Sequence, residues 1–193
     1  MVTLEKSIKK RKALLKATLN LVNNSGFQGA SMSKIARMAK VSPATIYLYF
    51  ENKQDLINQL YLEVKEDFSK AAFENYTDSM SIKDGFELIW HNIARYKLNQ
   101  VEYAYFLSQA DNTPIVDQQT IEKGLVNLQP LLDLWNRGIE ENVIKPYSPY
   151  LLYAYSIYPI AFLMTIQKRE AYVFSDACLK NAFQAAWDSI KMK

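Results

Sequence analysis

Apolar residues recur at helical spacing along almost the whole chain of 193 residues. The first such stripe consists of Leu14, Ala17, Thr18, Leu21 and Val22. These positions fall at i, i+3, i+4, i+7 and i+8, which places them on one face of a helix. Only 5 Gly and 6 Pro interrupt the chain, and no segment shows the strict alternation of a half-buried strand. The sequence therefore predicts an all-α fold of about nine helices.

Polar residues that precede these stripes mark the expected helix starts. A side-chain oxygen in this position accepts a hydrogen bond from the backbone N–H of the helix's first turn. The predicted capping residues are Ser31, Ser42, Ser81, Thr113, Ser148 and Ser175. The sequence from Asn52 to Asp55 resembles a capping box that opens a longer helix. Two prolines, Pro130 and Pro159, lie within apolar stripes, and we expect them to bend their helices.

Basic residues are concentrated near the N-terminus. Up to Asp55 the chain carries ten basic and three acidic residues, a net charge of +7, whereas the whole chain carries +3. The remainder is therefore mildly acidic. We predict a basic N-terminal domain at residues 1–52 and a larger helical domain at 53–193. A small basic domain suits binding to a polyanion, although a solvated lysine face on the first helix would give the same charge.

Two short predicted helices, joined by Lys40-Val41-Ser42, match a helix-turn-helix. The second helix of such a motif enters the DNA major groove. Its small N-terminal residues permit close approach to the bases, and its free N–H groups can bind a phosphate. The predicted DNA contacts are Ser31, Ser33, Ser42, Pro43, Ala44, Thr45, Tyr47, Leu48, Tyr49 and Lys53. We expect Ala44, Thr45 and Leu48 to contact base edges and the tyrosines and Lys53 to contact phosphates.

Three stretches resemble the DNA-binding domain of TetR/AcrR-type regulators: Ser31 to Ala36, Val41 to Phe50, and Asn52 to Leu56. The Tyr-x-Tyr-Phe-x-Asn-Lys sequence is the most specific part. The resemblance implies a three-helix DNA-binding domain, a helical ligand-binding and dimerisation domain, and a repressor that a small effector releases. Lys40 and Ala44 stand where the family often has glycine. We expect the first to strain the turn slightly and the second to alter which bases can be reached.

Effector binding is expected in the larger domain, where bent helices leave space between them. The predicted wall consists of Trp90, Tyr103, Phe106, Leu125, Leu128, Tyr155 and Phe162, with His91, Arg95 and Tyr96 as polar anchors. An apolar or aromatic effector, with or without an anionic group, would suit this set. The alternative for each aromatic residue is an ordinary core position.

A homodimer is expected from the last two long helices. The segment from Tyr150 to Gln167 is too apolar to be solvated on every side. The predicted interface on the final helix consists of Cys178, Leu179, Ala182, Phe183, Ala185, Ala186, Ser189 and Ile190. Two-fold symmetry would present two DNA-binding domains to a palindromic operator.

Several other classes of function have little support in the sequence. One His and one Cys do not supply a typical zinc site, and no nucleotide-binding loop or catalytic triad motif is present. We therefore expect no catalytic residues, no metal and no cofactor. The charged N-terminus and the lack of a long uninterrupted apolar run favour a cytoplasmic protein without a membrane span. The remaining alternative is an architectural protein that marks DNA while its larger domain binds a protein partner.

Overall fold

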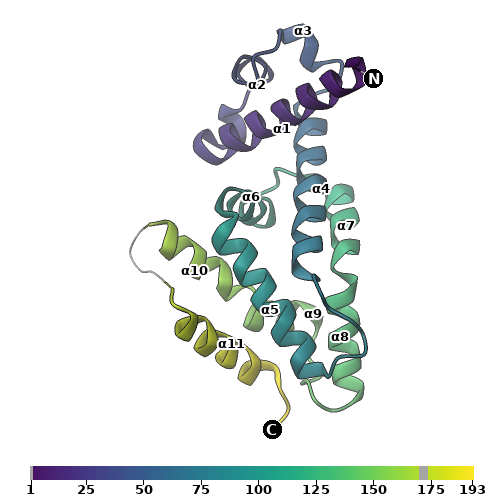
Figure 1. Ribbon diagram of the computed structural model, residues 1–193, viewed down its shortest axis with the longest axis vertical. Helices are drawn as coiled ribbons and strands as arrows, with labels where there is room; N and C mark the ends of the chain where they lie inside the picture. The colour runs from purple at the N-terminus through teal and green to yellow at the C-terminus, as the bar shows by residue number, and fades with distance from the viewer. Residues whose placement is uncertain (1, 170–173) are drawn as a thin grey trace. The chain divides into compact units, whose positions relative to one another are not determined.

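The computed structural model describes residues 2–169 and 174–193, and within them the protein is helical (Figure 1). The helices are α1 (Val2–Gly29), α2 (Met32–Met38), α3 (Pro43–Ile46), α4 (Lys53–Ala72), α5 (Ile82–Asn99), α6 (Val101–Asn112), α7 (Gln118–Leu125), the 3-10 turn η1 (Val126–Leu128), α8 (Gln129–Glu140), α9 (Pro149–Ser156), α10 (Pro159–Lys168) and α11 (Asp176–Ile190). Among the described residues, β-pairing is confined to an isolated bridge between Ile144 and Lys191. The all-α prediction is confirmed.

The chain forms two compact units. The N-terminal unit comprises Met1–Lys65 and Tyr105–Gly124, and the C-terminal unit comprises Glu66–Ala104 and Leu125–Lys193. Helix α4 begins at Lys53, immediately after the predicted domain boundary, and continues without a break from the first unit into the second. This helix therefore contributes residues to both units.

The core of the N-terminal unit is built from the predicted helix stripes. Leu14, Ile35, Ile46, Phe50 and Leu56 are buried, and they come from α1, α2, α3, the residues after α3, and α4. Burial of one such side chain contributes about 1.5–3 kcal/mol. These contacts pack α1 and the two short helices α2 and α3 against the first part of α4.

Polar contacts join the first part of α4 to the connection between α6 and α7. Gln54 Nε2 donates to the Ile115 carbonyl oxygen at 3.0 Å, and the Asn58 amide donates to the Asp117 carboxylate. The same carboxylate accepts from Thr120 N at 2.8 Å. Asp117 therefore caps α7, which begins at Gln118. The predicted start at Thr113 was wrong, because the chain needs residues 113–117 to cross to α4 before α7 begins.

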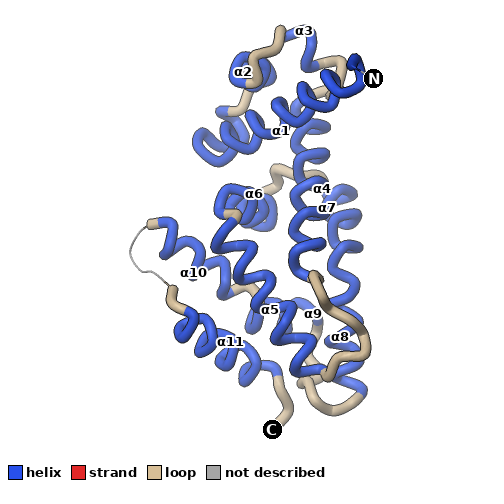
Figure 2. The backbone as a smooth tube through the Cα atoms, viewed as in Figure 1, coloured by secondary structure: helices blue, strands red, loops and turns tan. Residues whose placement is uncertain are grey.

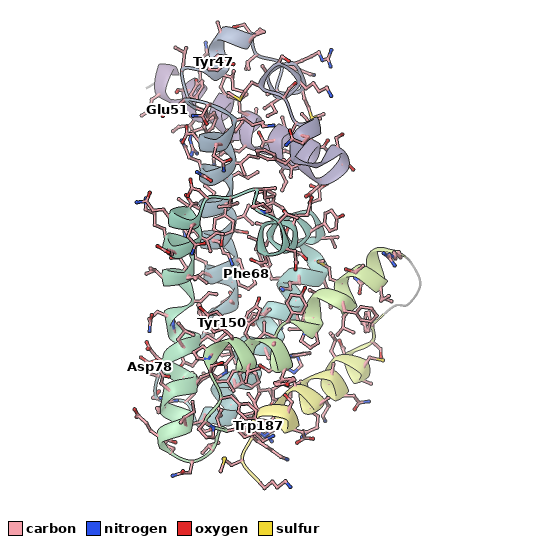
Figure 3. The ribbon with its side chains drawn as sticks, turned by 180° about the vertical axis from the view of Figure 1, so that it is seen from behind. Tyr47, Glu51, Phe68, Asp78, Tyr150 and Trp187 are labelled. Atoms are coloured by element: carbon pink, nitrogen blue, oxygen red, sulfur yellow. The ribbon has the colours of Figure 1, made fainter. Side chains whose placement is uncertain are left out.

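Aromatic side chains fill the core of the C-terminal unit. Phe86 and Trp90 of α5 pack on Phe183 of α11, with ring centroids 6.1 and 5.8 Å from the Phe183 ring. Trp187, labelled in Figure 3, adds a contact to Phe86 at 6.0 Å. Trp90 Nε1 also donates to the Ser156 carbonyl oxygen at 2.8 Å. Helix α5 is thus tied to both α9 and α11.

The two prolines expected to bend helices instead begin new ones, α8 and α10, which are labelled in Figure 2. Pro130 lies in the first turn of α8, after the 3-10 turn, and Pro159 lies in the first turn of α10. A missing N–H costs nothing in a first turn, so breaking the helix costs less than kinking it. The segment Pro149–Gln167 is apolar and long enough to cross a membrane by composition, with 28% of it buried. In this fold it is divided between α9 and α10.

Candidate functional site

The helix-turn-helix forms as the capping residues predict. Ser31 Oγ accepts from Lys34 N at 3.3 Å and begins α2. Ser42 Oγ accepts from Thr45 N at 3.2 Å and begins α3, with Pro43 in its first turn. Each cap stabilises its helix by about 1 kcal/mol. Such local hydrogen bonds are what allow a four-residue helix to keep its shape.

The turn between α2 and α3 passes through a left-handed residue. Lys40 has φ +55°, a conformation that side chains other than glycine rarely adopt. The strain is offset by hydrogen bonds on both sides, from Lys40 N to the Arg37 oxygen at 3.1 Å and from Val41 N to the Ala36 oxygen at 3.0 Å. The lysine found where the family often has glycine therefore adopts the left-handed conformation that glycine favours.

Helix α3 divides its residues between core and surface. Ile46 is fully buried, whereas Pro43 and Ala44 are exposed. Tyr47 and Leu48 follow at 58% and 82% exposure, and Tyr47 is labelled at the end of α3 in Figure 3. Neighbouring exposed apolar side chains, unlike single ones, are typical of interaction surfaces. The exposed side of α3 therefore has the chemistry of a recognition surface.

Three further predicted DNA contacts also have partners within the N-terminal unit. The Thr45 hydroxyl lies 2.7 Å from Ser42 Oγ. The Tyr49 hydroxyl accepts from Ser7 Oγ at 3.3 Å and keeps its own proton to donate. Lys53 Nζ donates to the Phe27 carbonyl oxygen at 3.1 Å and lies 4.0 Å from the centre of the Phe27 ring. Lys53 thus ties the start of α4 to the end of α1.

A surface hollow of about 700 Å³ is lined by residues in and next to α2 and α3. It is lined by Ser31, Ser33, Lys34, Arg37, Val41 and Pro43. Three of these six residues were predicted as DNA contacts. Lys34 and Arg37 were not, although both are exposed and their i, i+3 spacing places them on one face of α2. Their charges suit a phosphate at this hollow.

Five of the ten predicted effector residues line two clefts in the described part of the chain. Trp90, Tyr155 and Phe162 line a cleft of about 390 Å³ between α5, α9, α10 and α11. His91 and Arg95 line a second cleft of about 600 Å³, together with Leu98, Asn99, Gln167, Phe174, Asp176 and Leu179. Burial lowers the pKa of His91, an effect that Arg95 strengthens and Glu87 opposes. His91 is therefore neutral near pH 7 and can accept or donate a hydrogen bond.

The other five predicted effector residues lie outside both of these clefts. The Tyr96 hydroxyl donates to Asp67 Oδ2 at 2.9 Å. Burial, and to a lesser extent this hydrogen bond, raise the pKa of Tyr96. Phe106 is fully buried and belongs to the N-terminal unit. Tyr103 and Leu128 are half-buried, and Leu125 is exposed. The core alternative fits Tyr96 and Phe106 better than a pocket wall does.

The predicted interface residues on α11 face in different directions. Phe183, Ala186 and Ile190 are buried within the chain, so they offer little surface to a partner. Ala185 is exposed. The half-buried members are Cys178, Leu179, Ala182 and Ser189. Large apolar exposure occurs instead at Tyr150 and Phe162, at 86% and 65%.

Within the described residues, no group of three His, Cys, Asp or Glu side chains is placed to hold a metal ion. Two buried polar atoms in the same part of the chain have no hydrogen-bond partner, Trp135 Nε1 and Arg137 Nε. Neither lies in the clefts described above. The exposed surface of α2 and α3 is therefore the best-defined candidate site.

Comparisons with known proteins agree with this geometry. Residues 14–60 match the model of the bacterial regulatory proteins of the tetR family, and residues 81–191 match a tetracyclin repressor-like C-terminal domain. The uncharacterized HTH-type transcriptional regulator YhgD of Bacillus subtilis is 24% identical over 147 residues, which cover 75% of this chain and 77% of the relative.

Solved structures extend the likeness to the whole chain. A TetR family transcription regulator from Marinobacter aquaeolei matches with a TM-score of 0.90 and 26% identity over 100% of both chains. FadR of Bacillus subtilis, solved in complex with stearoyl-CoA, matches in fold with a TM-score of 0.73, 20% identity and coverage of 93% and 98%. With its exposed recognition helix and a C-terminal family match that spans more than half of its length, the chain belongs to the TetR family of DNA-binding transcriptional regulators.

Proposed function

We propose that the protein is a homodimeric repressor that binds a palindromic operator and that a small apolar or aromatic effector releases it. The observation that carries the DNA-binding part is the exposed side of α3, where Ala44, Tyr47 and Leu48 face solvent beside the capped helix start at Ser42. The major groove is about 12 Å wide, so the small residues at the start of α3 allow its backbone to come close to the bases.

Each exposed residue has a role that follows from its chemistry. Ala44, Thr45 and Leu48 are proposed to contact base edges, including thymine methyl groups. Ser42, Pro43, Tyr47 and Tyr49 are proposed to place α3 against the phosphates. Ser31 and Ser33, whose hydroxyls lie 3.2 Å apart, are proposed to bind a second phosphate beside Lys34 and Arg37. Lys53 is a weaker candidate for a phosphate contact, because its ammonium group already donates a hydrogen bond to the Phe27 carbonyl oxygen.

A second copy of the chain is the proposed cover for the apolar side of α9 and α10. Tyr150, Tyr155, Tyr158 and Phe162 are all more than two-fifths exposed, which is unusual for a monomer in water. A protein that binds chromosomal DNA works in the compartment that holds the chromosome. We therefore propose that protein rather than lipid contacts the apolar side of α9 and α10. Two-fold symmetry would also supply the second DNA-binding domain that a palindrome needs.

The proposed interface keeps the two C-terminal segments expected from the sequence but takes fewer residues from α11. Helix α11 would contribute Ala182, Ala185 and Ser189, whose small side chains allow close helix approach, while α9 and α10 would contribute most of the apolar area. The cleft lined by Trp90, Tyr155 and Phe162 borders the same helices. We therefore assign that cleft to the dimer contact rather than to the effector.

The cleft beside His91 and Arg95 is the better candidate for the effector. Leu98, Phe174 and Leu179 give it apolar surface, and Arg95 gives it a cation. An apolar or aromatic molecule with an anionic group could contact the apolar surface and pair with the Arg95 guanidinium. The stearoyl-CoA complex of Bacillus subtilis FadR indicates that a protein of this fold can bind a long acyl thioester, so acyl thioesters belong among the compounds to test.

The continuous helix α4 is the proposed route from effector to DNA. Its last turns belong to the C-terminal unit and its first turns to the N-terminal unit. An effector changes DNA affinity only if it binds the two states of the protein unequally, and DNA must then weaken effector binding by the same factor.

The experiment has two stages. Fragments bound by the protein are first selected from the source genome, and compounds are then screened for thermal stabilisation of the protein. The proposal predicts that some stabilising compounds, aromatic carboxylates and acyl thioesters among them, reduce affinity for the selected fragment. If every stabilising compound leaves that affinity unchanged, the larger domain is not an effector sensor, and the architectural alternative would be favoured.

A further inference from the structure

The N-terminal turns of α1 form a lysine-rich extension that precedes the part of the chain matched by the family model. That match begins at residue 14, whereas α1 begins at Val2. Between these points the extension carries Lys6, Lys9, Lys10 and Lys12, all exposed, and one acid, Glu5. An exposed cationic helix next to a DNA-binding motif is complementary in charge to a phosphate backbone.

Side-chain contacts fix this extension to the recognition motif. Ser7 Oγ donates to the Tyr49 hydroxyl at 3.3 Å. Arg11 donates to Gln59 Oε1 at 2.8 Å and pairs with Glu63, and its guanidinium lies 5.7 Å from the centre of the Phe50 ring. The extension is therefore helical and is attached through Ser7 and Arg11 to the surface that holds Tyr49.

The helical phase separates the lysines into two sides. At about 100° per residue, Lys10 lies about 60° and Lys6 about 100° from Ser7, the residue that contacts Tyr49. Lys12 and Lys16 lie about 140° and 180° from it, on the far side of the helix. Lys9 is already paired with Glu5 at 2.6 Å, whereas Lys6 and Lys10 form no ion pair within the described part of the chain.

We propose that Lys6 and Lys10 bind DNA phosphates that flank the sequence contacted by α3, extending the interface beyond the helix-turn-helix. This inference rests on the proposed DNA-binding surface of α3. It assigns Arg11 a different role, since Glu63 neutralises its charge and its contacts to Gln59 and Phe50 hold the extension in place.

The test compares two charge-matched double variants of the full chain. Lys6→Gln with Lys10→Gln removes the proposed contacts, and Lys12→Gln with Lys16→Gln removes equal charge from the opposite side of the same helix. Glutamine has nearly the helix propensity of lysine, so circular dichroism should show both variants folded. Affinity for the duplex that the wild-type protein selects is then measured between 50 and 200 mM salt.

Each neutralised phosphate contributes about 0.9 to the slope of log affinity against log salt. The Lys6/Lys10 variant should therefore lose about 1.8 from the slope per protomer, so that its affinity falls about 12-fold less per protomer over this salt range. The Lys12/Lys16 variant should keep the wild-type slope. Equal slopes for all three proteins, or equal losses in the two variants, would overturn the proposal. If the wild-type protein selects no DNA, the proposed function itself fails.

Discussion

Lys53 gives the sharpest contrast between a role predicted from the sequence and the role that the structure supports. Its Nζ donates to the Phe27 carbonyl oxygen at 3.1 Å and lies 4.0 Å from the Phe27 ring. Replacement by methionine keeps an unbranched apolar chain and similar helix propensity. It removes both the hydrogen bond and the cation–π contact, so it should loosen the junction between the end of α1 and the start of α4.

The expected cost follows from these two contacts. A hydrogen bond to a charged donor contributes about 1.5–3 kcal/mol, and a cation–π contact at an exposed site about 0.5–1 kcal/mol. Lys53 is half-buried, and water can replace part of the lost hydrogen bond. We therefore expect Lys53→Met to lower the stability of the N-terminal unit by about 1–2 kcal/mol, below the sum of the two terms.

Urea unfolding can localise this effect within the chain. The 3 tryptophans, Trp90, Trp135 and Trp187, all belong to the C-terminal unit. Far-UV circular dichroism should therefore show the destabilisation, while tryptophan fluorescence should change less. Lys16→Met, which removes the same charge from an exposed site on α1, serves as the control. Unchanged stability together with a salt slope smaller by about 0.9 per protomer would refute the reasoning and make Lys53 a phosphate contact.

Three further outcomes are expected. Ser42→Ala removes the cap of α3, whose hydroxyl accepts from Thr45 N, and should cost about 1 kcal/mol of stability in urea and weaken DNA binding; equal DNA affinity would argue against a need for that cap. Phe162→Glu places a charge on the proposed dimer face and should yield monomers in sedimentation, with unchanged helicity; a persistent dimer would exclude this face. Burial lowers the pKa of His91 below its usual value, so the unfolded chain binds protons more readily. Stability should therefore rise with pH up to the normal histidine range, about 6.5. His91→Gln should flatten this rise. An unchanged dependence of stability on pH between 5 and 7 in this variant would contradict the role given to His91.

Helix starts could be predicted because their determinants are local. Ser31, Ser42, Ser81, Ser148 and Ser175 all accept the expected backbone hydrogen bond in the folded chain. Each of these bonds forms between residues three apart, so the sequence contains both partners. The same holds for the exposed and buried sides of α3, which follow from helical phase alone.

Features that depend on distant residues could not be predicted in the same way. Thr113 was predicted as a helix start, whereas α7 begins after Asp117, whose hydrogen bond with Asn58 joins residues far apart in the sequence. The effector residues were grouped by aromatic character, but Phe106 and Trp90 belong to different units. Which side of α11 is buried also depends on where α5 lies, and the apolar stripe alone does not contain that information.

The central claim is that the exposed side of α3 reads DNA. The most direct measurement is sequencing of duplexes that the wild-type protein selects from a random pool, repeated with Leu48→Ala and Ala44→Gly. The account predicts an inverted repeat with half-sites about one or two helical turns apart and, in both variants, altered base preference at matching positions in each half-site. A wild-type selection without any enriched sequence, or variants that select the identical repeat with equal affinity, would contradict the account.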